Sequence, residues 1–349
     1  MKVAIVAFNN IKYSPYVKTY SNYLDKKGIS YDVIIPNRDG IEETLGEKFY
    51  AISWNKNKGK VYNFLKFTRE AKKILKKNKY DFLFVLTTMP AVLLSGVLTS
   101  RYKNRYLVDI RDYTHEKVSL YYQIESKVLK NAALRVISSY GFKNFLPELD
   151  YLMCHNTSYN FENAAKQFDK KTDGKIIIGY VGTIAYVNRC KELIELVKKD
   201  ERFAFHLYGN ENHGTVIKDL VSELGCDRIC YFGSYMPSDK ERILNSVDIL
   251  FNVYGNSTPL VKYALSNKLY DSFYFKKPLL TSPDTDMSYQ AGEFSFDIDS
   301  NTASLDGLFD WYNSIDSENM IAYMNKRLDE YFAEMQLFNE TLGGIFEKN

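Results

Sequence analysis

A lysine and an aspartate three residues apart are the residues of this sequence best suited to bind a ligand. Lys268 and Asp271 fall in residues 266–278, which have the pattern of a polar loop followed by a short helix, and an apolar pair, Leu279 and Leu280, then begins a strand. A cation and a carboxylate at the start of a helix suit the two hydrophilic parts of a nucleotide: Lys268 the phosphates and Asp271 the ribose hydroxyls. The segment therefore predicts a site for a nucleotide-diphosphate donor.

Four loops in the second half of the chain carry residues that suit the same ligand. Glycine lets the backbone approach a phosphate, a helix start supplies amide donors, and a tyrosine can line a flat base. The loops follow successive predicted strands and contain Gly182, Thr183 and Arg189; Gly209; Tyr235; and Asn256 and Ser257. Turn formation and ordinary packing explain each loop taken singly, so the hypothesis depends on their joint position at the carboxyl ends of parallel strands.

Strand-like apolar runs alternate with helical patterns along almost the whole chain, which is typical of βαβ units and a parallel sheet. The strands predicted in the first half are 3–8, 31–35, 51–53, 82–86, 106–110, 134–137 and 151–154, and those in the second half are 176–181, 203–208, 229–232 and 249–253. The sequence therefore predicts an α/β fold with two Rossmann-like domains in tandem.

The length of 349 residues exceeds the usual size of one hydrophobic core. A polar stretch without apolar periodicity separates the two series of strands. The expected division is an N-terminal Rossmann-like domain over 1–156, a linker over 157–174, a C-terminal Rossmann-like domain over 175–317 and a helical segment over 318–349. An apolar stripe on that last helix must dock somewhere, and the first domain is one candidate.

Several segments resemble bacterial glycosyltransferases of the GT-B fold, close to family 4 and typical of capsular polysaccharide and exopolysaccharide assembly. The matching segments are 267–271 with 277–280, 180–183, 109–112 and 139–147. The resemblance covers most of the chain and is more specific in the second domain. It implies two tandem Rossmann-like domains with a deep interdomain cleft and an activity that moves a sugar from a nucleotide-diphosphate sugar to an acceptor.

The resemblance also implies roles for individual residues. Asp271 falls on the second acid of the family's E-x7-E motif, which usually holds the ribose, whereas Tyr263 stands where the first acid is expected. The family's arginine is not at Thr183, so Arg189 and Lys268 would supply the phosphate charge. Similarity to the family favours retention of the anomeric configuration.

Polar residues also follow the predicted strands of the first domain. Asp112 or His115 could act as a base towards an acceptor hydroxyl, and the alternative is a salt-bridged structural corner around Arg111. Asp109 and Asn10 are expected on the acceptor side as well, although turn formation is an alternative for Asn10.

No metal or other cofactor is expected for this chemistry. Helix-terminal amides and the cations Arg189 and Lys268 would stabilise the leaving nucleoside diphosphate. Two Asp-x-Asp patterns, 284–286 and 297–299, do not follow an early strand as a metal-dependent single-domain transferase would require. A nicotinamide-dependent dehydrogenase is disfavoured because no GxGxxG follows the first strand of either domain.

The four cysteines form no CxxC pair and no signal peptide is recognised, and both observations point to a cytoplasmic protein. The net charge of +3 does not argue for nucleic-acid binding, and the chain leads into a strand without a signal peptide. Residues 56–79 contain ten Lys or Arg and one acid on a partly amphipathic helix. Peripheral contact with the anionic inner face of the cell membrane is one interpretation of that run, and a solvated helix face is the other.

The leading hypothesis is a glycosyltransferase that extends a saccharide or a lipid-linked acceptor in surface polysaccharide synthesis. A nucleotide-sugar epimerase of the same fold is the first alternative, for which Asp112 and His115 would be the acid and base candidates. A non-catalytic nucleotide-sugar-binding subunit is the second, because Tyr263 replaces an expected acid.

Overall fold

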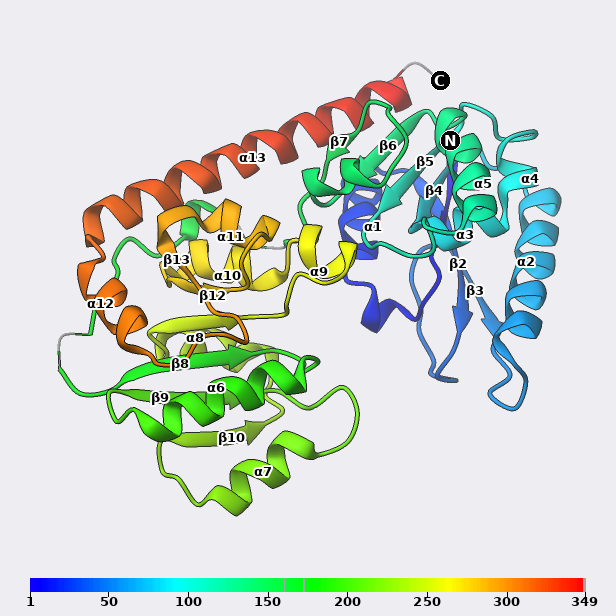
Figure 1. Cartoon of the computed structure of the whole chain (residues 1–349). Helices are drawn as coiled ribbons and strands as arrows, with labels where there is room; N and C mark the ends of the chain where they lie inside the picture. Colours follow the sequence, from blue (N-terminus) through cyan, green and yellow to red (C-terminus); the bar gives the residue numbers. More distant parts are fainter. Residues whose placement is uncertain (158, 160, 172, 348–349) are drawn as a thin grey trace. The chain divides into compact units, whose positions relative to one another are not determined.

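The computed structural model describes residues 1–157, 159, 161–171 and 173–347. The chain divides into two compact units, one formed by residues 1–158 and 334–349 and the other by residues 159–333. Strands and helices alternate along the chain in both units, as the colour order of Figure 1 shows. The predicted α/β fold with two Rossmann-like domains is confirmed.

The first unit contains a sheet of seven strands among its described residues, in the order β3-β2-β1-β4-β5-β6-β7, and all neighbouring strands are parallel. Its strands are β1 (Lys2–Val6), β2 (Ser30–Asn37), β3 (Lys48–Ser53), β4 (Phe82–Leu86), β5 (Tyr106–Ile110), β6 (Leu134–Ile137) and β7 (Leu152–Met153). Its helices are α1 (Val17–Lys26), α2 (Lys60–Lys77), α3 (Thr88–Leu93), α4 (Ser95–Leu98) and α5 (Ser119–Lys130), with short 3-10 turns at Ile11–Tyr13 and Tyr140–Asn144.

The second unit contains a parallel sheet of six strands among its described residues, in the order β10-β9-β8-β11-β12-β13. Its strands are β8 (Ile176–Val181), β9 (Phe203–Tyr208), β10 (Ile229–Gly233), β11 (Ile249–Asn252), β12 (Leu279–Thr281) and β13 (Ser295–Asp297). Its helices are α6 (Val187–Lys199), α7 (Val216–Leu224), α8 (Lys240–Asn245), α9 (Pro259–Tyr263), α10 (Asn267–Phe275), α11 (Asp286–Ala291) and α12 (Asp306–Ser314), and α13 (Ser317–Glu347) begins in this unit. Its 3-10 turns are Phe161–Asn163, Pro237–Asp239 and Gly292–Phe294.

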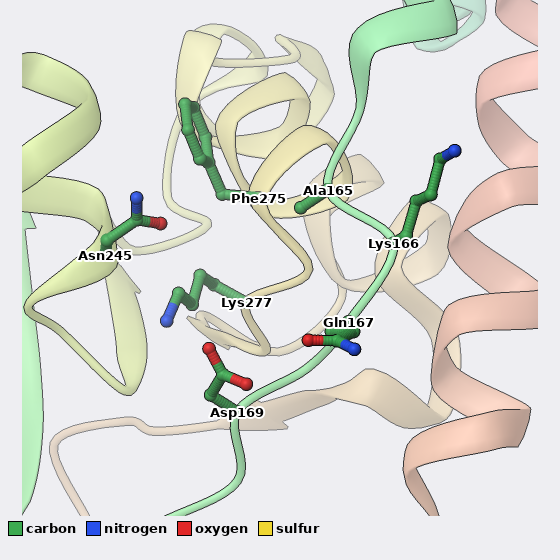
Figure 2. A pocket seen from close by; sticks show the side chains of 7 residues that line it. All are labelled: Ala165, Lys166, Gln167, Asp169, Asn245, Phe275 and Lys277. Carbon is green, nitrogen blue, oxygen red and sulfur yellow. The ribbon is translucent and has the colours of Figure 1, made fainter.

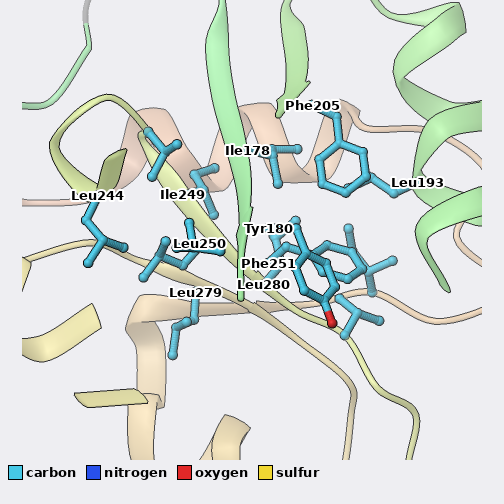
Figure 3. Close-up of a cluster of buried hydrophobic side chains, with 14 of the residues drawn as sticks. Ile178, Tyr180, Leu193, Phe205, Leu244, Ile249, Leu250, Phe251, Leu279 and Leu280 are labelled. Atoms are coloured by element: carbon cyan, nitrogen blue, oxygen red, sulfur yellow. The ribbon is translucent and has the colours of Figure 1, made fainter. Parts of the chain in front are cut away.

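The central strands are apolar at nearly every position because helices cover both faces of a parallel sheet and bury its strands on both sides. All residues of β4, β5 and β11 are buried. In the second unit the core includes aromatic rings from three adjacent strands, and Figure 3 shows Tyr180, Phe205 and Phe251 among the aliphatic side chains. The rings of Tyr180 and Phe251 stack with centroids 5.4 Å apart. This packing fixes the carboxyl end of β8, where the predicted phosphate loop begins.

The segment expected to be a linker packs against the second unit. Phe168 is buried in the core of that unit, and Phe161 and Ala164 pack against the same core. The sequence did not predict these contacts, because the segment is mostly polar and its three apolar residues have neither helical nor strand periodicity.

Helix α13 contributes to both cores, each within its own unit. Met320, Met324 and Leu328 are buried in the core of the second unit, whereas Phe338 and Leu342 are buried in the core of the first. Phe332, an apolar residue of the same helix, is exposed. The C-terminal residues of the chain therefore complete the hydrophobic core of the N-terminal sheet.

Candidate active site

A short chain of hydrogen bonds holds the N-terminus of α10 at the carboxyl end of β11. The hydroxyl of Ser266, the N-cap residue, accepts a hydrogen bond from the backbone N–H of Lys268 and donates one of 2.7 Å to Asn252 Oδ1 at the end of β11. Serine is a preferred N-cap because its oxygen satisfies a helix amide that has no partner within the helix. The cap therefore positions Lys268 and Asp271 as the sequence predicts.

Lys268 is buried among tyrosine rings. Its side-chain Nζ donates a hydrogen bond of 2.6 Å to the hydroxyl of Tyr254 and lies 4.5 Å from the centroid of the Tyr180 ring. The residue is 7% exposed. Because an ammonium over an aromatic face is stabilised by the ring quadrupole, these two rings offset part of the cost of removing the charge from water.

The backbone of Gly182 passes directly beside the Lys268 ammonium. A Cβ atom placed on Gly182 would lie 3.6 Å from Lys268 Nζ, and the φ of Gly182 is +124°. Gly209 lies against it, because a Cβ atom on Gly209 would meet the carbonyl oxygen of Gly182 at 2.0 Å. Two adjacent strand ends thus need glycine for close backbone approach, and the backbone of the β8 loop passes beside the ammonium.

Asp271 lies one turn further along α10 and has different partners. Its Oδ1 accepts hydrogen bonds of 2.6 Å from the hydroxyl of Tyr159 and of 2.7 Å from Nζ of Lys240. The Asp271 residue is 2% exposed, and the Lys240 side chain is 32% exposed. The second carboxylate oxygen, Oδ2, accepts from neither of these donors, which suits a carboxylate that binds ribose hydroxyls.

Tyr235 and Arg189 lie near these two charged residues. Burial raises the pKa of Tyr235, and the negative charge of Asp271 raises it further, which places the phenol in the field of that carboxylate. Arg189, on the first turn of α6, forms an ion pair of 2.7 Å with Glu192. A Cβ atom on Gly255 would lie 3.5 Å from Arg189 Nη2, so the guanidinium also reaches the loop after β11.

The remaining residues predicted for the donor site occupy the same loops. Thr183 is exposed, and its carbonyl oxygen accepts a hydrogen bond from the Tyr180 hydroxyl. Asn256 and Ser257 are exposed, and the Asn256 side-chain amide donates to the carbonyl oxygen of Pro283. The contacts of Thr183 and Asn256 therefore hold loops in place, and the structure gives neither of them a contact with Lys268 or Asp271.

Sequence reasoning missed the residues that contact the two charged side chains. Tyr159 and Lys240 lie on segments distant in sequence from Asp271, and the sequence pattern places Tyr254 only in a loop. Tyr254 follows a buried strand directly, so its ring could have been considered as a neighbour of the next helix start. No comparable local signal identifies Tyr159 or Lys240.

The side chains of Asp109 and Asn10 make their contacts inside the first unit. Asp109 is fully buried and pairs with Arg111 at 2.8 Å, which favours the salt-bridged corner over an acceptor contact. The buried Asn10 side chain bonds to Asn37, Glu43 and the backbone N–H of Arg38. The structure therefore gives both side chains contacts inside the unit.

Asp112 and His115 are both exposed at the carboxyl edge of the same sheet. Surrounding protein atoms partly desolvate the Asp112 carboxyl and raise its pKa, with Arg111 opposing and Asp109 adding to the shift. The ring of His115 meets that of Tyr121 edge to face at 5.5 Å. A carboxyl whose pKa is raised towards neutrality suits a general base, so Asp112 keeps its predicted role as a candidate.

A pair of buried glutamates lies next to these candidates and was not predicted. Glu125 is 1% exposed and Glu116 is 6% exposed. In the described part of the chain neither oxygen of Glu125 has a hydrogen-bond partner. Burial raises the pKa of Glu125 to about 8, and the charge of Glu116 adds to the shift. A hydrogen-bonded series of hydroxyls, from Tyr121 through Thr88 to Thr114, is linked to Glu116 by the Thr114 backbone N–H.

No group of three or more His, Cys, Asp or Glu side chains in the described ranges is arranged to hold a metal ion. The expectation of chemistry without a metal or other cofactor stays a prediction, which depends on the cations and amides of the site itself.

Comparison with known proteins gives the class of this protein. Residues 2–139 match the model of the family described as Glycosyl transferase 4-like. No curated protein matches the chain. The predicted resemblance to glycosyltransferases similar to family 4 is thereby confirmed.

Solved structures resemble the whole chain at low sequence identity. A sucrose-phosphate synthase from Thermosynechococcus elongatus is 12% identical with a TM-score of 0.72, and each chain is covered to 100%. The lipopolysaccharide outer core galactosyltransferase WaaB is 12% identical with a TM-score of 0.64 and the same coverage. Anabaena Alr3699/HepE, solved with UDP and glucose, is 11% identical with a TM-score of 0.65, covering 98% of this chain and 99% of that one. These likenesses establish the fold.

The fold is therefore that of the two-Rossmann-domain, or GT-B, glycosyltransferases. The family match over residues 2–139, together with this fold, indicates an enzyme whose activity is glycosyl transfer.

The buried Glu125 predicts a specific pH dependence of stability in the first unit. Its folded-state pKa is raised, so the folded unit retains a proton that the unfolded chain releases. The associated stability is complete below the unfolded pKa of about 4.5 and is lost as pH rises to about 8. Replacing Glu125 by Gln should therefore stabilise the unit by about 2 to 4 kcal/mol above pH 8 and change little near pH 4.

This effect can be measured by denaturant unfolding followed by Trp54 fluorescence in a Trp311→Phe background, which leaves one tryptophan in the first unit. Glu148→Gln, at an exposed position of the same unit, is the matched control. A stability difference between Glu125→Gln and the parent that is equal at low and high pH would contradict the assignment.

Proposed function

We propose that this protein transfers a sugar from a nucleoside-diphosphate sugar to a saccharide or lipid-linked acceptor in surface polysaccharide synthesis. The observation that carries the proposal is the arrangement at the start of α10. There Lys268 and Asp271, both buried, lie one turn apart with separate partners beside the glycine backbone of the β8 loop. The similar Anabaena protein was solved in complex with UDP and glucose, which supports a nucleotide sugar for this chain.

The two charged residues bind different parts of the nucleotide. Lys268, close to the backbone of Gly182, is the cation for the diphosphate, and Arg189 is a second cation at the start of α6. Asp271 holds the ribose hydroxyls. Tyr235, which lies in the electrostatic field of Asp271, lines the site of the nucleotide base. Tyr263, where related enzymes have an acid, leaves the transferred sugar to other groups of the site.

Glycosyl transfer breaks the bond between the anomeric carbon and the diphosphate oxygen. Negative charge develops on the leaving diphosphate, and a cation already held in place stabilises that charge without reorganising during the reaction. Lys268 is held by the hydrogen bond to Tyr254 and by the Tyr180 ring. These groups supply the stabilisation that a metal ion supplies elsewhere, so we propose metal-independent transfer, with retention as the family resemblance implies.

On the acceptor side, Asp112 is the candidate base for the attacking hydroxyl. It is exposed, and its raised pKa brings it closer to the working pH than an ordinary aspartate. His115, exposed three residues later, is the second candidate for binding or orienting the acceptor.

Helix α2 supports a peripheral contact with a membrane. Its buried face consists of Asn63, Phe67, Ala71 and Leu75, so the apolar residues Val61 and Leu65 lie outside the face that packs on the unit. Val61 is 72% exposed and Leu65 is 66% exposed, and the same helix carries an excess of lysine. Exposed apolar groups among basic residues suit the anionic inner face of a cell membrane. No helix of the described residues is long and apolar enough to cross a membrane.

Incubation with a panel of nucleotide sugars, with and without membrane extract as acceptor, tests the proposed reaction. We expect transfer of labelled sugar to a saccharide or lipid fraction with one donor of the panel, and released nucleoside diphosphate in equal amount. Asp112→Asn should reduce the rate at least about tenfold with an unchanged KM for the donor. Isomerised donor formed without acceptor would replace the proposal by the epimerase alternative.

Nucleotide binding by calorimetry separates the roles of Lys268 and Asp271. Lys268→Met should weaken nucleoside-diphosphate binding about tenfold or more and leave nucleoside binding almost unchanged, because only the phosphates contact the cation. Asp271→Asn should weaken both ligands. Lys262→Met, on the neighbouring helix α9, is the control and should bind like the parent. Equal losses for nucleoside and diphosphate in Lys268→Met would remove the phosphate role of that lysine.

Flotation with vesicles tests the membrane contact of α2. Val61→Ser with Leu65→Ser should reduce binding to anionic vesicles, and neutralising Lys72, Lys73, Lys76 and Lys77 should reduce it further and remove its dependence on anionic lipid. A chain with Lys198 and Lys199 neutralised is the control, since these residues end α6 in the other unit. Undiminished flotation of the α2 variants would leave this helix as a solvated surface.

A further inference from the structure

Lys277 is a mostly buried lysine whose ammonium has no hydrogen-bond or ion-pair partner among the described residues. The residue is 6% exposed, and no hydrogen bond or ion pair to its Nζ is present in the part of the chain that the structure describes. The adjacent Lys276, also buried, differs because its Nζ donates a hydrogen bond of 2.6 Å to the carbonyl oxygen of Phe273. The Nζ is not among the fully buried polar atoms of the described residues that lack a partner, so the ammonium is accessible from the adjacent pocket, where a ligand can reach it.

The side chain of Lys277 lines a pocket of about 260 Å³. Figure 2 shows the pocket with Lys277, Asp169 and Asn245, which come from three different segments of the second unit. Lys166 and Gln167 contribute polar side chains from the segment before Asp169, and Phe275 contributes an apolar wall. The pocket therefore offers a buried cation, two side-chain amides and a second, exposed lysine.

The pocket lies at the edge of the sheet opposite the donor site. Asn245 is the last residue of α8 and precedes β11, and Lys277 precedes β12, so both stand at the amino ends of parallel strands. Lys268 and Asp271 stand at the carboxyl end of β11 instead. Lys277 also follows the C-terminus of α10, whose N-terminus carries the two donor charges.

The size and charge of the pocket restrict its occupant. A volume of about 260 Å³ is below the roughly 300 Å³ at which pockets for drug-sized ligands begin. A second nucleotide sugar is therefore too large. Asp169 and Asp248 act on the Lys277 ammonium from a distance, and burial outweighs them and lowers the pKa of Lys277. A small anion placed against Nζ would supply the acceptor that these carboxylates do not.

We propose that this pocket is a binding site for a small oxyanion, a carboxylate or phosphate group, with the Lys277 ammonium as its cation and the amides of Asn245 and Gln167 as further donors. The site is separate from the nucleotide site and uses no residue assigned to glycosyl transfer. Asp169 at its rim weakens the affinity for an anion and favours a ligand that also carries a hydroxyl or ammonium group.

Lysine side-chain NMR on the full chain tests the site directly. The Cε signal of Lys277 is assigned by its loss in Lys277→Met, and that of Lys268 by its loss in Lys268→Met, so the two sites are observed separately. Titration with inorganic phosphate and with acetate should shift the Lys277 signal and raise its titration midpoint, because a bound anion favours the charged form. A response to only one of the two anions identifies the group that the site prefers.

Two variants should change the anion affinity in opposite directions. Asp169→Asn should tighten anion binding about threefold, because a negative charge near the ammonium is removed. Asn245→Leu, at an exposed position, should weaken binding while the Lys277 signal persists, which separates loss of binding from loss of fold. Lys199→Met, at the exposed end of α6, should bind like the parent.

A Lys277 signal that neither anion moves would overturn the proposal. A shift confined to the Lys268 signal would assign anion binding to the nucleotide site alone and would also overturn it. Equal affinities in the parent, Asp169→Asn and Asn245→Leu would show that the anion does not occupy this pocket.

Discussion

The second unit depends on keeping two opposite charges buried one helical turn apart without joining them. Lys268 and Asp271 are within reach of each other on α10, yet each has its own partners: tyrosines for Lys268, and Lys240 with Tyr159 for Asp271. Direct pairing with Asp271 would compensate the charge of the Lys268 ammonium, whereas Asp271 is paired with Lys240 instead. Tyr254 and Tyr180 stabilise the ammonium without supplying a negative charge, so its positive charge stays uncompensated. The aromatic surroundings of β8 and β11 are thus part of the electrostatics of the site as well as of the core.

Much of the fold could be predicted because its central strands are buried on both faces and read as continuous apolar runs. The bounds of β4, β5 and β8 were predicted to the residue. The position of Lys268 at a helix start followed from local signals, namely a polar loop, a capping serine and a helical pattern. Lys240 and Tyr159 could not be found in this way, because their relation to Asp271 exists only after distant segments pack together.

Polar residues after the strands of the first unit show the limit of the same reasoning. Asn10 and Asp109 occupy positions where ligand contacts are common, but their side chains are used to hold loops and a buried guanidinium. A strand end is also where a chain must turn, and both tasks select the same residue types. Glu125 left a readable signal, since it lies on the face of α5 that also carries the buried Val128 and Leu129. A carboxyl at such a position is either paired or protonated.

The first unit is discontinuous in sequence, and this has a consequence for biosynthesis. Its sheet is complete at residue 153, but Phe338 and Leu342 of α13 are fully buried in its core. While the chain is being translated, part of the apolar surface of the N-terminal unit stays uncovered until Phe338 and Leu342 have left the ribosome. The second unit, whose residues are contiguous, can close its core first. Contrary to the usual N-to-C order, the second unit is therefore the one that can fold completely before the unit that precedes it.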